Sequence, residues 1–525
     1  MDPQASGPEL SRRGILGGIG ASYLQAGVSI VATFVSTPIF LAWLGAETFG
    51  LYLATTSWVG YLAVFRVGFP QAAGNQIAAS VARSEPDQAA DVLKTSVYLS
   101  ALAALAAAAV MAALIATGIV SARLFRGSDA VERLAMPLLV TSGAGFLIAL
   151  PLQQYIAGLR ALRLIHLEQL VQALVRALGV AGGIAVLAAG LGAVPFAASQ
   201  ASVTVLAGLL CAVLVARALG REVRARARFR GGLARALVNP GLHFLLLALS
   251  GALIWGTQNI VISMYDSAAA VTPYAVSFRL ITMALTWLAL GIGALGPTVT
   301  SLWVSGRRES LERVLLELLK LGMAGVVVVG IVLGCFGRDF VRLWAGPDAV
   351  VSSRVMWTFV AILLAVSFTA CFELLLIATS KHARYAHVSL LEGGMNLGLS
   401  VLLIGPLGVW GVALGTLAAH LMGSAWYVPR SVTRMLSLGW GRIVRESIAP
   451  MLLPAAGSLT WSGICASSIP VGGWGSWMLC AGGSAASFVI IYAALGLNEW
   501  ERENARRIAG VLRQRWPFSK GRSGG

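Results

Sequence analysis

Apolar residues along this chain form long runs, separated by short clusters of charged residues, proline and glycine. One helix needs about 20 consecutive apolar residues to cross a lipid bilayer, and runs of that length recur along almost the whole sequence. The expected spans are residues 14–44, 50–72, 92–120, 134–158, 168–192, 195–216, 240–264, 273–302, 314–337, 355–379, 385–404, 407–428, 447–468 and 474–496. The pattern therefore predicts an all-α polytopic membrane protein with about 14 transmembrane helices.

Composition agrees with this reading. The chain has 525 residues, of which 57% are hydrophobic and 12% are charged, with a mean hydropathy of +0.80. About 25% of the residues in an ordinary soluble domain are charged, so this chain could not cover a soluble surface. Most soluble enzymes and nucleic-acid-binding modules are thereby excluded. The net charge of +17 is explained by positive residues held at the cytoplasmic face, and no nucleic-acid partner is expected.

The distribution of Lys and Arg predicts the topology. With a cytoplasmic amino terminus, 29 of the 39 Lys and Arg residues fall on cytoplasmic segments and 6 on external loops. The positive-inside rule therefore places both termini in the cytoplasm. Seven arginines lie in the loop at 217–235. Two roles stay open for this loop, namely binding of anionic lipid headgroups and that of a solvated linker that fixes the topology.

A repeated sequence divides the chain into two halves. The segment Ile156–Arg163 recurs 221 residues later as Ile377–Arg384, with the shared pattern I-A-x-x-[RK]-x-x-R. Six spans separate the copies, and an even number preserves orientation, so we expect two parallel six-helix bundles around a central cavity. The predicted segments are 1–13 (cytoplasmic), 14–216 (first bundle), 217–239 (basic linker), 240–428 (second bundle), 429–446 (basic loop), 447–496 (helices 13 and 14) and 497–525 (basic tail).

Motifs of common catalytic sites are missing from the sequence. It contains no Walker A, HExxH or GxSxG motif, and its five histidines and five cysteines show no metal-ligand spacing. A disulfide between Cys465 and Cys480, which flank one short loop, is left open. We expect no enzyme activity, no metal and no cofactor. Two parallel bundles around a cavity are typical of an alternating-access transporter.

Charged and polar residues inside the predicted spans are the candidate functional residues. A charge at such depth costs at least about 2.5–3.5 kcal/mol unless it is paired or hydrated. Lys320 lies near a span end, where it is expected to reach the surface. The embedded charges are Arg66, Arg176, Arg279, Glu373 and Glu392. Their polar companions include Gln25, Gln153, Gln154, Gln258, Asn259 and Asn396.

Three blocks of sequence resemble the polysaccharide transporter family, the O-antigen and exopolysaccharide flippases of the multidrug/oligosaccharidyl-lipid/polysaccharide exporter superfamily. The first is Pro38 with Leu44–Tyr52, continuing to Val67–Phe69, the second is Tyr274–Leu280, leading to Gly296 and Pro297, and the third is Asn396–Thr416, in the order that the family has. Members often carry an acid near position 66, where this chain has Arg66. The resemblance implies a multi-pass protein of the bacterial plasma membrane that flips undecaprenyl-diphosphate-linked oligosaccharide repeat units for surface polysaccharide synthesis.

Partners and coupling follow from the same resemblance. It implies contact with the lipid-linked oligosaccharide and membrane lipids, association with a polysaccharide polymerase and chain-length proteins, and coupling to H⁺ or Na⁺. Two roles stay open for the embedded charges. In the first, Arg66 pairs with Glu373 and Arg176 with Glu392 as structural salt bridges. In the second, Arg176, Arg279, Gln258, Asn259 and Asn396 line the cavity and bind substrate, while Arg66, Glu373 and Glu392 serve gating or ion coupling.

Three rival functions are open at this point. A cation-coupled multidrug exporter of the same superfamily would favour embedded acids over embedded arginines. A lipid II flippase would share the architecture and differ in the sugar. A membrane polysaccharide polymerase would need a larger external loop than any that the spans leave.

Overall fold

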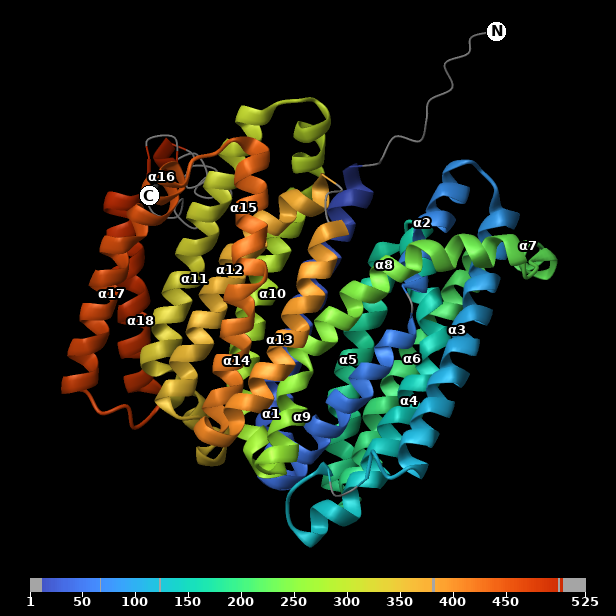
Figure 1. Ribbon diagram of the computed structural model, residues 1–525, viewed down its shortest axis with the longest axis horizontal. Helices are drawn as coiled ribbons and strands as arrows, with labels where there is room; N and C mark the ends of the chain where they lie inside the picture. The colour runs from blue at the N-terminus through green and yellow to red at the C-terminus, as the bar shows by residue number, and fades with distance from the viewer. Residues whose placement is uncertain (1–11, 67, 122–123, 380–382, 499–500, 504–525) are drawn as a thin grey trace, which may run out of the picture.

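The computed structural model describes residues 12–66, 68–121, 124–379, 383–498 and 501–503. Within these residues the chain is helical, with short connections and no β-strand, which confirms the expected fold class. Eleven of the described helices are long and apolar enough to cross a membrane. Figure 1 shows them as two groups of helices that meet at one end of the molecule and diverge toward the other.

Six spans make up the N-terminal half. They are formed by α1 (Arg12–Tyr61) with η1 (Leu62–Arg66) and α2 (Phe69–Ala82), then α3 (Pro86–Ala116), α4 (Asp129–Ala161), α5 (Ile165–Ala188) and α6 (Ala193–Leu219). The helix α1 reverses direction at Gly45, whose φ of 76° and ψ of 162° are not helical. Glycine is suited to this reversal because it has no Cβ to clash at positive φ. The α1 hairpin thus supplies span 1 and most of span 2.

The C-terminal half repeats this plan with two broken helices. Its elements are α8 (Gly231–Trp255), α9 (Thr257–Tyr265), α10 (Ala268–Val304), α11 (Arg308–Ala345), η3 (Pro347–Ala349), α12 (Ser353–Ala378), α13 (Ala383–Leu407), α14 (Val409–Met422) and α15 (Ser424–Leu436). Span 7 is broken at Gly256 between α8 and α9, and span 12 at Gly423 between α14 and α15. The short α7 (Arg221–Arg226) joins the halves.

Two further spans follow the second half. They are formed by α16 (Trp440–Ile443), η4 (Val444–Ile448) and α17 (Ala449–Ser468), and by α18 (Trp474–Ile491) with η5 (Tyr492–Gly496). They pack on α11 at the outer side of the C-terminal half (Figure 1). Each of the fourteen predicted spans thus lies on described helices, once the α1 hairpin and the two broken helices are taken into account.

Helix packing repeats between the halves. In the first half α1 packs on α5, and α4 on α6; in the second, α8 packs on α13, and α12 on α14. These are the same pairs shifted by six spans, as two parallel repeats require. Within the repeated octamer, residues 380–382 of the second copy lie outside the described residues. A rotation of one half onto the other about the membrane normal stays a prediction.

The halves are fastened together at the end of the molecule that holds Gly45, here called the Gly45 end. Arg126 in the α3–α4 loop donates from Nη1 to the carbonyl of Tyr265, 2.9 Å away. Its backbone N–H donates to the carbonyl of Ser263 at 2.9 Å, and its own carbonyl accepts from the N–H of Ala268 at 2.7 Å. The hydroxyl of Thr272 donates to the carbonyl of Ala46 at 2.6 Å. These contacts close the molecule between the halves at this end.

The opposite end, here called the α7 end, carries the first described turn of α1, the linker and residues 501–503 (Figure 1). The charge distribution predicts that this end is cytoplasmic. Asp91 on α3 anchors the linker, because its carboxylate accepts from the backbone N–H of Arg228 at 2.6 Å and from Nε of Arg230 at 2.6 Å. The linker is therefore held against α3 over these residues.

Several boundaries and one pairing differ from expectation. The helix α2 continues to Ala82, ten residues past the expected end of span 2, and α8 begins at Gly231, inside the predicted linker. Lys320 does not reach the surface: its ammonium group is buried against Glu501, 2.6 Å from Oε2. The five cysteines are free, so the disulfide left open between Cys465 and Cys480 does not form.

Candidate functional site: an arginine-lined cavity in the N-terminal half

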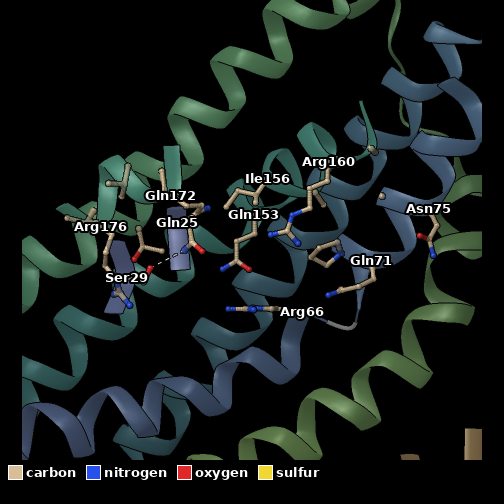
Figure 2. A pocket seen from close by; sticks show the side chains of 18 of the residues that line it. Gln25, Ser29, Arg66, Gln71, Asn75, Gln153, Ile156, Arg160, Gln172 and Arg176 are labelled. Atoms are coloured by element: carbon tan, nitrogen blue, oxygen red, sulfur yellow. Dashed lines mark hydrogen bonds between the residues drawn. The ribbon is translucent and has the colours of Figure 1, made fainter. Parts of the chain in front are cut away.

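A polar cavity of about 850 Å³ lies within the N-terminal half, at the level of the helix segments nearest the α7 end. Side chains from α1, η1, α2, α4, α5 and α6 line it (Figure 2). Its polar and charged lining residues are Gln25, Ser29, Arg66, Gln71, Asn75, Gln153, Arg160, Gln172, Arg176 and Thr204. Three of these are arginines and none is an acid, so the cavity is suited to an anionic ligand.

Arg66 lies at the base of this cavity, where the helix of span 2 is broken (Figure 2). Gly68 has a left-handed φ of 66°, and Pro70 follows in the first turn of α2. A glycine at positive φ ends one helix, and a proline at the start suits the next, so the local sequence dictates the break. The guanidinium lies over the ring of Phe146 at 5.4 Å, and its buried Nε has no hydrogen-bond partner among the described residues.

Arg160 enters the cavity from the end of α4. It forms a bidentate salt bridge with Glu168, in which Nη2 lies 2.9 Å from Oε1 and Nε lies 3.1 Å from Oε2. Glu168 is only 1% exposed, whereas the arginine side chain is 60% exposed. The sequence places Arg160 in a cytoplasmic segment and in the repeated octamer, and neither position predicts a place in the cavity. The one available signal was its spacing of eight residues from Glu168 across a short turn.

Arg176 supplies the third positive charge, about 17 Å along α5 from its start at Ile165. It is exposed within the cavity and forms no ion pair with any other described residue. Figure 2 shows it beside Gln25 and Gln172, on the opposite side of the cavity from Gln71 and Arg160. Arg176 thus lines a cavity within the N-terminal half, whereas the sequence places it at a central cavity between the halves; its binding of substrate stays a prediction.

Arg279 lies outside this cavity lining, in the interface between the halves. It donates from Nη1 to the hydroxyl of Thr37 and lies 5.7 Å above the ring of Phe49, one residue on each arm of the α1 hairpin. Its charge acts on that of Arg176 through space. Because its own contacts join α10 to the α1 hairpin, Arg279 fastens the halves and does not line the cavity.

Three of the predicted polar companions also hold helices together. The amide of Asn396 donates to the carbonyls of Leu253 and Ile254 at 3.2 and 2.9 Å, next to the break between α8 and α9. Gln258 donates to the same Ile254 carbonyl and to the hydroxyl of Thr416. These side chains satisfy backbone groups that the broken helix leaves without partners, and they do not line the cavity.

Asn259 makes a different contact, between the halves. Its amide donates to the hydroxyl of Ser57 on α1 at 3.0 Å. The nearby hydroxyls of Tyr61 and Thr257 are 2.6 Å apart. Gln258, Asn259 and Asn396 therefore make contacts between helices, whereas two other predicted companions, Gln25 and Gln153, line the cavity.

The two embedded acids lie together in the C-terminal half. Glu373 on α12 and Glu392 on α13 interact electrostatically with one another and with His420 on α14. Neither forms an ion pair with Arg66 or Arg176 in the described part of the chain, so the predicted pairs Arg66–Glu373 and Arg176–Glu392 are wrong. The expected gate, in which an acid pairs with Arg66, is likewise not formed among the residues that the structure describes.

Comparison with known families decides the assignment. The model of the family described as polysaccharide biosynthesis protein matches residues 16–303, which is more than half of the chain. The chain belongs to this family. The matched region contains the whole arginine-lined cavity of this polysaccharide biosynthesis family member. No curated protein matches this chain in sequence.

Solved structures share the fold at low sequence identity. The lipid II flippase MurJ in an inward closed conformation is 12% identical, with a TM-score of 0.65 over 92% of this chain and 98% of its own. An inward-facing multidrug resistance MATE family transporter of the MOP superfamily is 16% identical, with a TM-score of 0.63 over 80% of this chain and 96% of its own. An outward-facing MATE family transporter is 15% identical, with a TM-score of 0.56 over 80% of this chain and 96% of its own. The family member therefore has the fold of MOP-superfamily transporters.

Proposed function

We propose that this protein flips an undecaprenyl-diphosphate-linked oligosaccharide across a bacterial plasma membrane by alternating access, for surface polysaccharide synthesis. The observation that carries the proposal is the cavity with Arg66, Arg160 and Arg176 and no acid in its lining. A diphosphate diester is an anion of high charge density, and arginine binds phosphate oxygens through paired, charge-assisted hydrogen bonds.

The state of the three arginines supports a phosphate ligand. Glu168 already neutralises Arg160, whereas Arg66 and Arg176 have no acidic partner among the described residues. Two unneutralised guanidinium groups within the bilayer are costly unless a ligand or water compensates them. The two negative charges of the diphosphate would neutralise the two positive charges of Arg66 and Arg176.

The remaining lining suits the sugar. Five amide side chains, those of Gln25, Gln71, Asn75, Gln153 and Gln172, surround the arginines. Amides donate and accept hydrogen bonds, as hydroxyl groups of an oligosaccharide require. With the halves fastened at the Gly45 end and the cavity nearer the α7 end, the substrate enters from the cytoplasm in this state. Both termini are cytoplasmic in this proposal, and a polysaccharide polymerase and chain-length proteins receive the product.

The test is transport of a fluorescent undecaprenyl-diphosphate-linked oligosaccharide in proteoliposomes, read as the fraction quenched from outside. We expect R66A and R176A each to weaken binding about 10- to 150-fold, since one charge-assisted hydrogen bond contributes about 1.5–3 kcal/mol. R66K and R176K retain the positive charge and lose the bidentate hydrogen bonding of the guanidinium, so each should bind more tightly than the corresponding alanine variant and less tightly than the native protein. Native mass spectrometry of the bound lipid measures affinity apart from transport.

R354A is the matched control. Arg354 is also an arginine over an aromatic ring, 5.6 Å from that of Trp410, but it lies at the start of α12, outside the cavity. Transport by R354A should equal that of the native protein. Undiminished binding in both R66A and R176A would refute the cationic site. An increase in the chain length of the oligosaccharide during the assay would instead show polymerase activity.

A lipid II flippase is the second candidate, because the fold match to MurJ extends over 92% of this chain. Both candidates need the diphosphate, so they differ only in the sugar that the amides contact. Competition between lipid II and the oligosaccharide lipid in the same assay separates them. A cation-coupled multidrug exporter is disfavoured, since a cationic drug would meet Arg66 and Arg176, which have no acidic partner among the described residues.

A further inference from the structure

The basic linker between the halves is fastened along one face of α3. The carboxylate of Asp91 accepts two bonds from it. Nζ of Lys94 donates to the carbonyl of Ala227 at 2.9 Å, and the hydroxyl oxygen of Thr95 accepts from the backbone N–H of Arg230 at 3.2 Å. Asp91, Lys94 and Thr95 are three or four residues apart, so they lie on one face of the helix. The linker therefore follows a defined course along α3.

The same face of α3 changes from polar to apolar at Tyr98. The ring of Tyr98 meets that of Phe229 in the linker edge-on, with centroids 6.2 Å apart, and both side chains are half-exposed. Beyond Tyr98 the face continues with Leu102 and Leu105, which are 62% and 68% exposed. From Tyr98 to Ala116 the helix has no charged residue and is about 27 Å long, close to the hydrocarbon thickness of a bilayer. Because aromatic side chains gather at the membrane–water boundary, this aromatic pair marks the membrane surface beside the linker.

A second lipid-facing surface ends at the linker, on α6. Leu206, Leu209 and Val213 are exposed along one face of this helix. Arg217 follows Val213 by one turn on the same face and is also exposed. The helix α7 contacts both α3 and α6 and lies at the outer edge of the N-terminal half (Figure 1). The linker therefore lies where two lipid-facing surfaces reach the α7 end of the molecule.

Most of the positive charge at this junction is not neutralised by the protein. Glu222 is the one acid in the sequence between residues 217 and 235, and among the described residues the one ion pair of this segment joins Arg230 to Asp91. The exposed arginines that form no ion pair with another described residue are Arg217, Arg221, Arg226 and Arg228. An arginine near an anionic membrane surface strengthens binding about fivefold. Four such residues beside the membrane boundary are suited to anionic headgroups.

We propose that the junction of α3, α6 and α7 binds the phosphodiester headgroup of an anionic phospholipid of the cytoplasmic leaflet. Arg226 and Arg228, on either side of the anchored Ala227, contact the phosphate, and Tyr98 and Phe229 contact the start of the acyl chains. Guanidinium groups bind phosphate oxygens through charge-assisted hydrogen bonds. A linker that only fixed the topology would need its charge but no defined course. The bonds to α3 hold the arginines in place before the lipid arrives, which lowers the entropic cost of binding.

The first experiment measures lipid binding by native mass spectrometry of the full chain in detergent, titrated with phosphatidylglycerol or with zwitterionic phosphatidylcholine. We expect the native protein to bind phosphatidylglycerol more tightly. R226Q/R228Q should weaken this binding about 25-fold, at about fivefold for each arginine, and leave phosphatidylcholine binding unchanged. R307Q/R308Q is the matched control, because it removes the same charge from two exposed arginines at the turn between α10 and α11. Its affinity for phosphatidylglycerol should stay within about twofold of that of the native protein.

A second variant separates the position of the arginines from their charge. D91A removes the anchor of the linker, keeps every arginine and raises the net charge by one. Attraction by charge alone therefore predicts tighter binding of phosphatidylglycerol by D91A. We expect binding about fivefold weaker, because the released linker must be ordered again when the lipid binds. Equal or tighter binding by monodisperse D91A would overturn the ordered site.

Two further results would contradict the proposal. One is equal affinity for the two lipids in the native protein, or a preference for phosphatidylglycerol that R226Q/R228Q retains in full. The other is competition by glycerol phosphate, the headgroup without acyl chains, which would show a site for a soluble phosphate instead of a membrane lipid. Because salt screens exposed charges, raising the salt from about 0.1 to about 0.5 M should weaken phosphatidylglycerol binding more in the native protein than in R226Q/R228Q. These measurements use no oligosaccharide lipid, so their outcome is independent of the transport function.

Discussion

The buried pair of Lys320 and Glu501 offers a quantitative test of what holds the end of the described chain in place. Lys320 on α11 is 5% exposed and Glu501 is 6% exposed, with their charged atoms 2.6 Å apart. At an effective dielectric constant of about 20, two charges at this distance attract by roughly 6 kcal/mol before the cost of desolvation. Removing one partner leaves the other charge buried, which costs about 3–5 kcal/mol. K320M should therefore release the segment around Glu501.

Hydrogen exchange measures this release directly. The N–H groups of Glu501 and Arg502 donate to the side chain and carbonyl of Asn498, at 2.8 and 3.0 Å. We expect their exchange in K320M to accelerate at least about 100-fold, corresponding to about 3 kcal/mol in the opening equilibrium. The double variant K320M/E501L removes both charges and should exchange within about 10-fold of the native protein. If K320M exchanged as slowly as the native protein, the ion pair would not be what holds this segment.

Three further substitutions test the packing. A Cβ at Gly50 would overlap the carbonyl oxygen of Ala268, so G50A should destabilise the closed Gly45 end by about 1–3 kcal/mol. The control is G60A, because the space around Gly60 is open. Equal melting temperatures of G50A and G60A in detergent would contradict the predicted overlap. N396L removes one hydrogen bond to each of two carbonyls at the α8–α9 break, which keep Thr257 and Gln258 as donors. It should therefore cost only about 0.5–1.5 kcal/mol for each bond lost, measured by the same melts against N396Q. D91A should expose the linker to trypsin, and unchanged cleavage kinetics would show that Asp91 does not anchor it.

Sequence patterns predicted the spans well because the hydrophobic thickness of a bilayer fixes the length of each apolar run. The breaks at Gly45 and Gly68 were within the motif blocks, but the sequence did not show that α2 would continue to Ala82. Helix ends are uncertain where apolar residues continue past the membrane surface. Span count and packing order are therefore predictable here, while exact boundaries are not.

Residue depth was more predictable than residue direction. Counting along a helix placed Arg176 and Arg279 within the bilayer, yet only Arg176 lines the cavity. In helices that are apolar on every side, the hydrophobic pattern does not show which face is turned inward. The same ambiguity explains why Gln258 and Asn396 were expected in the cavity and are instead partners of the α8–α9 break. Arg160 was missed because a residue near a span end also suits a topology signal.

The fastening at the Gly45 end consists largely of main-chain atoms on the C-terminal side. Arg126 contacts the carbonyls of Ser263 and Tyr265 and the N–H of Ala268, and Thr272 contacts the carbonyl of Ala46. Peptide groups are present whatever side chain a residue carries, so mutations at positions 263 and 265 preserve these bonds provided that the backbone keeps its course. Sequence variation can therefore accumulate on one side of the contact without altering the mutual orientation of the halves, whereas variation at Arg126 removes the side-chain bond at once.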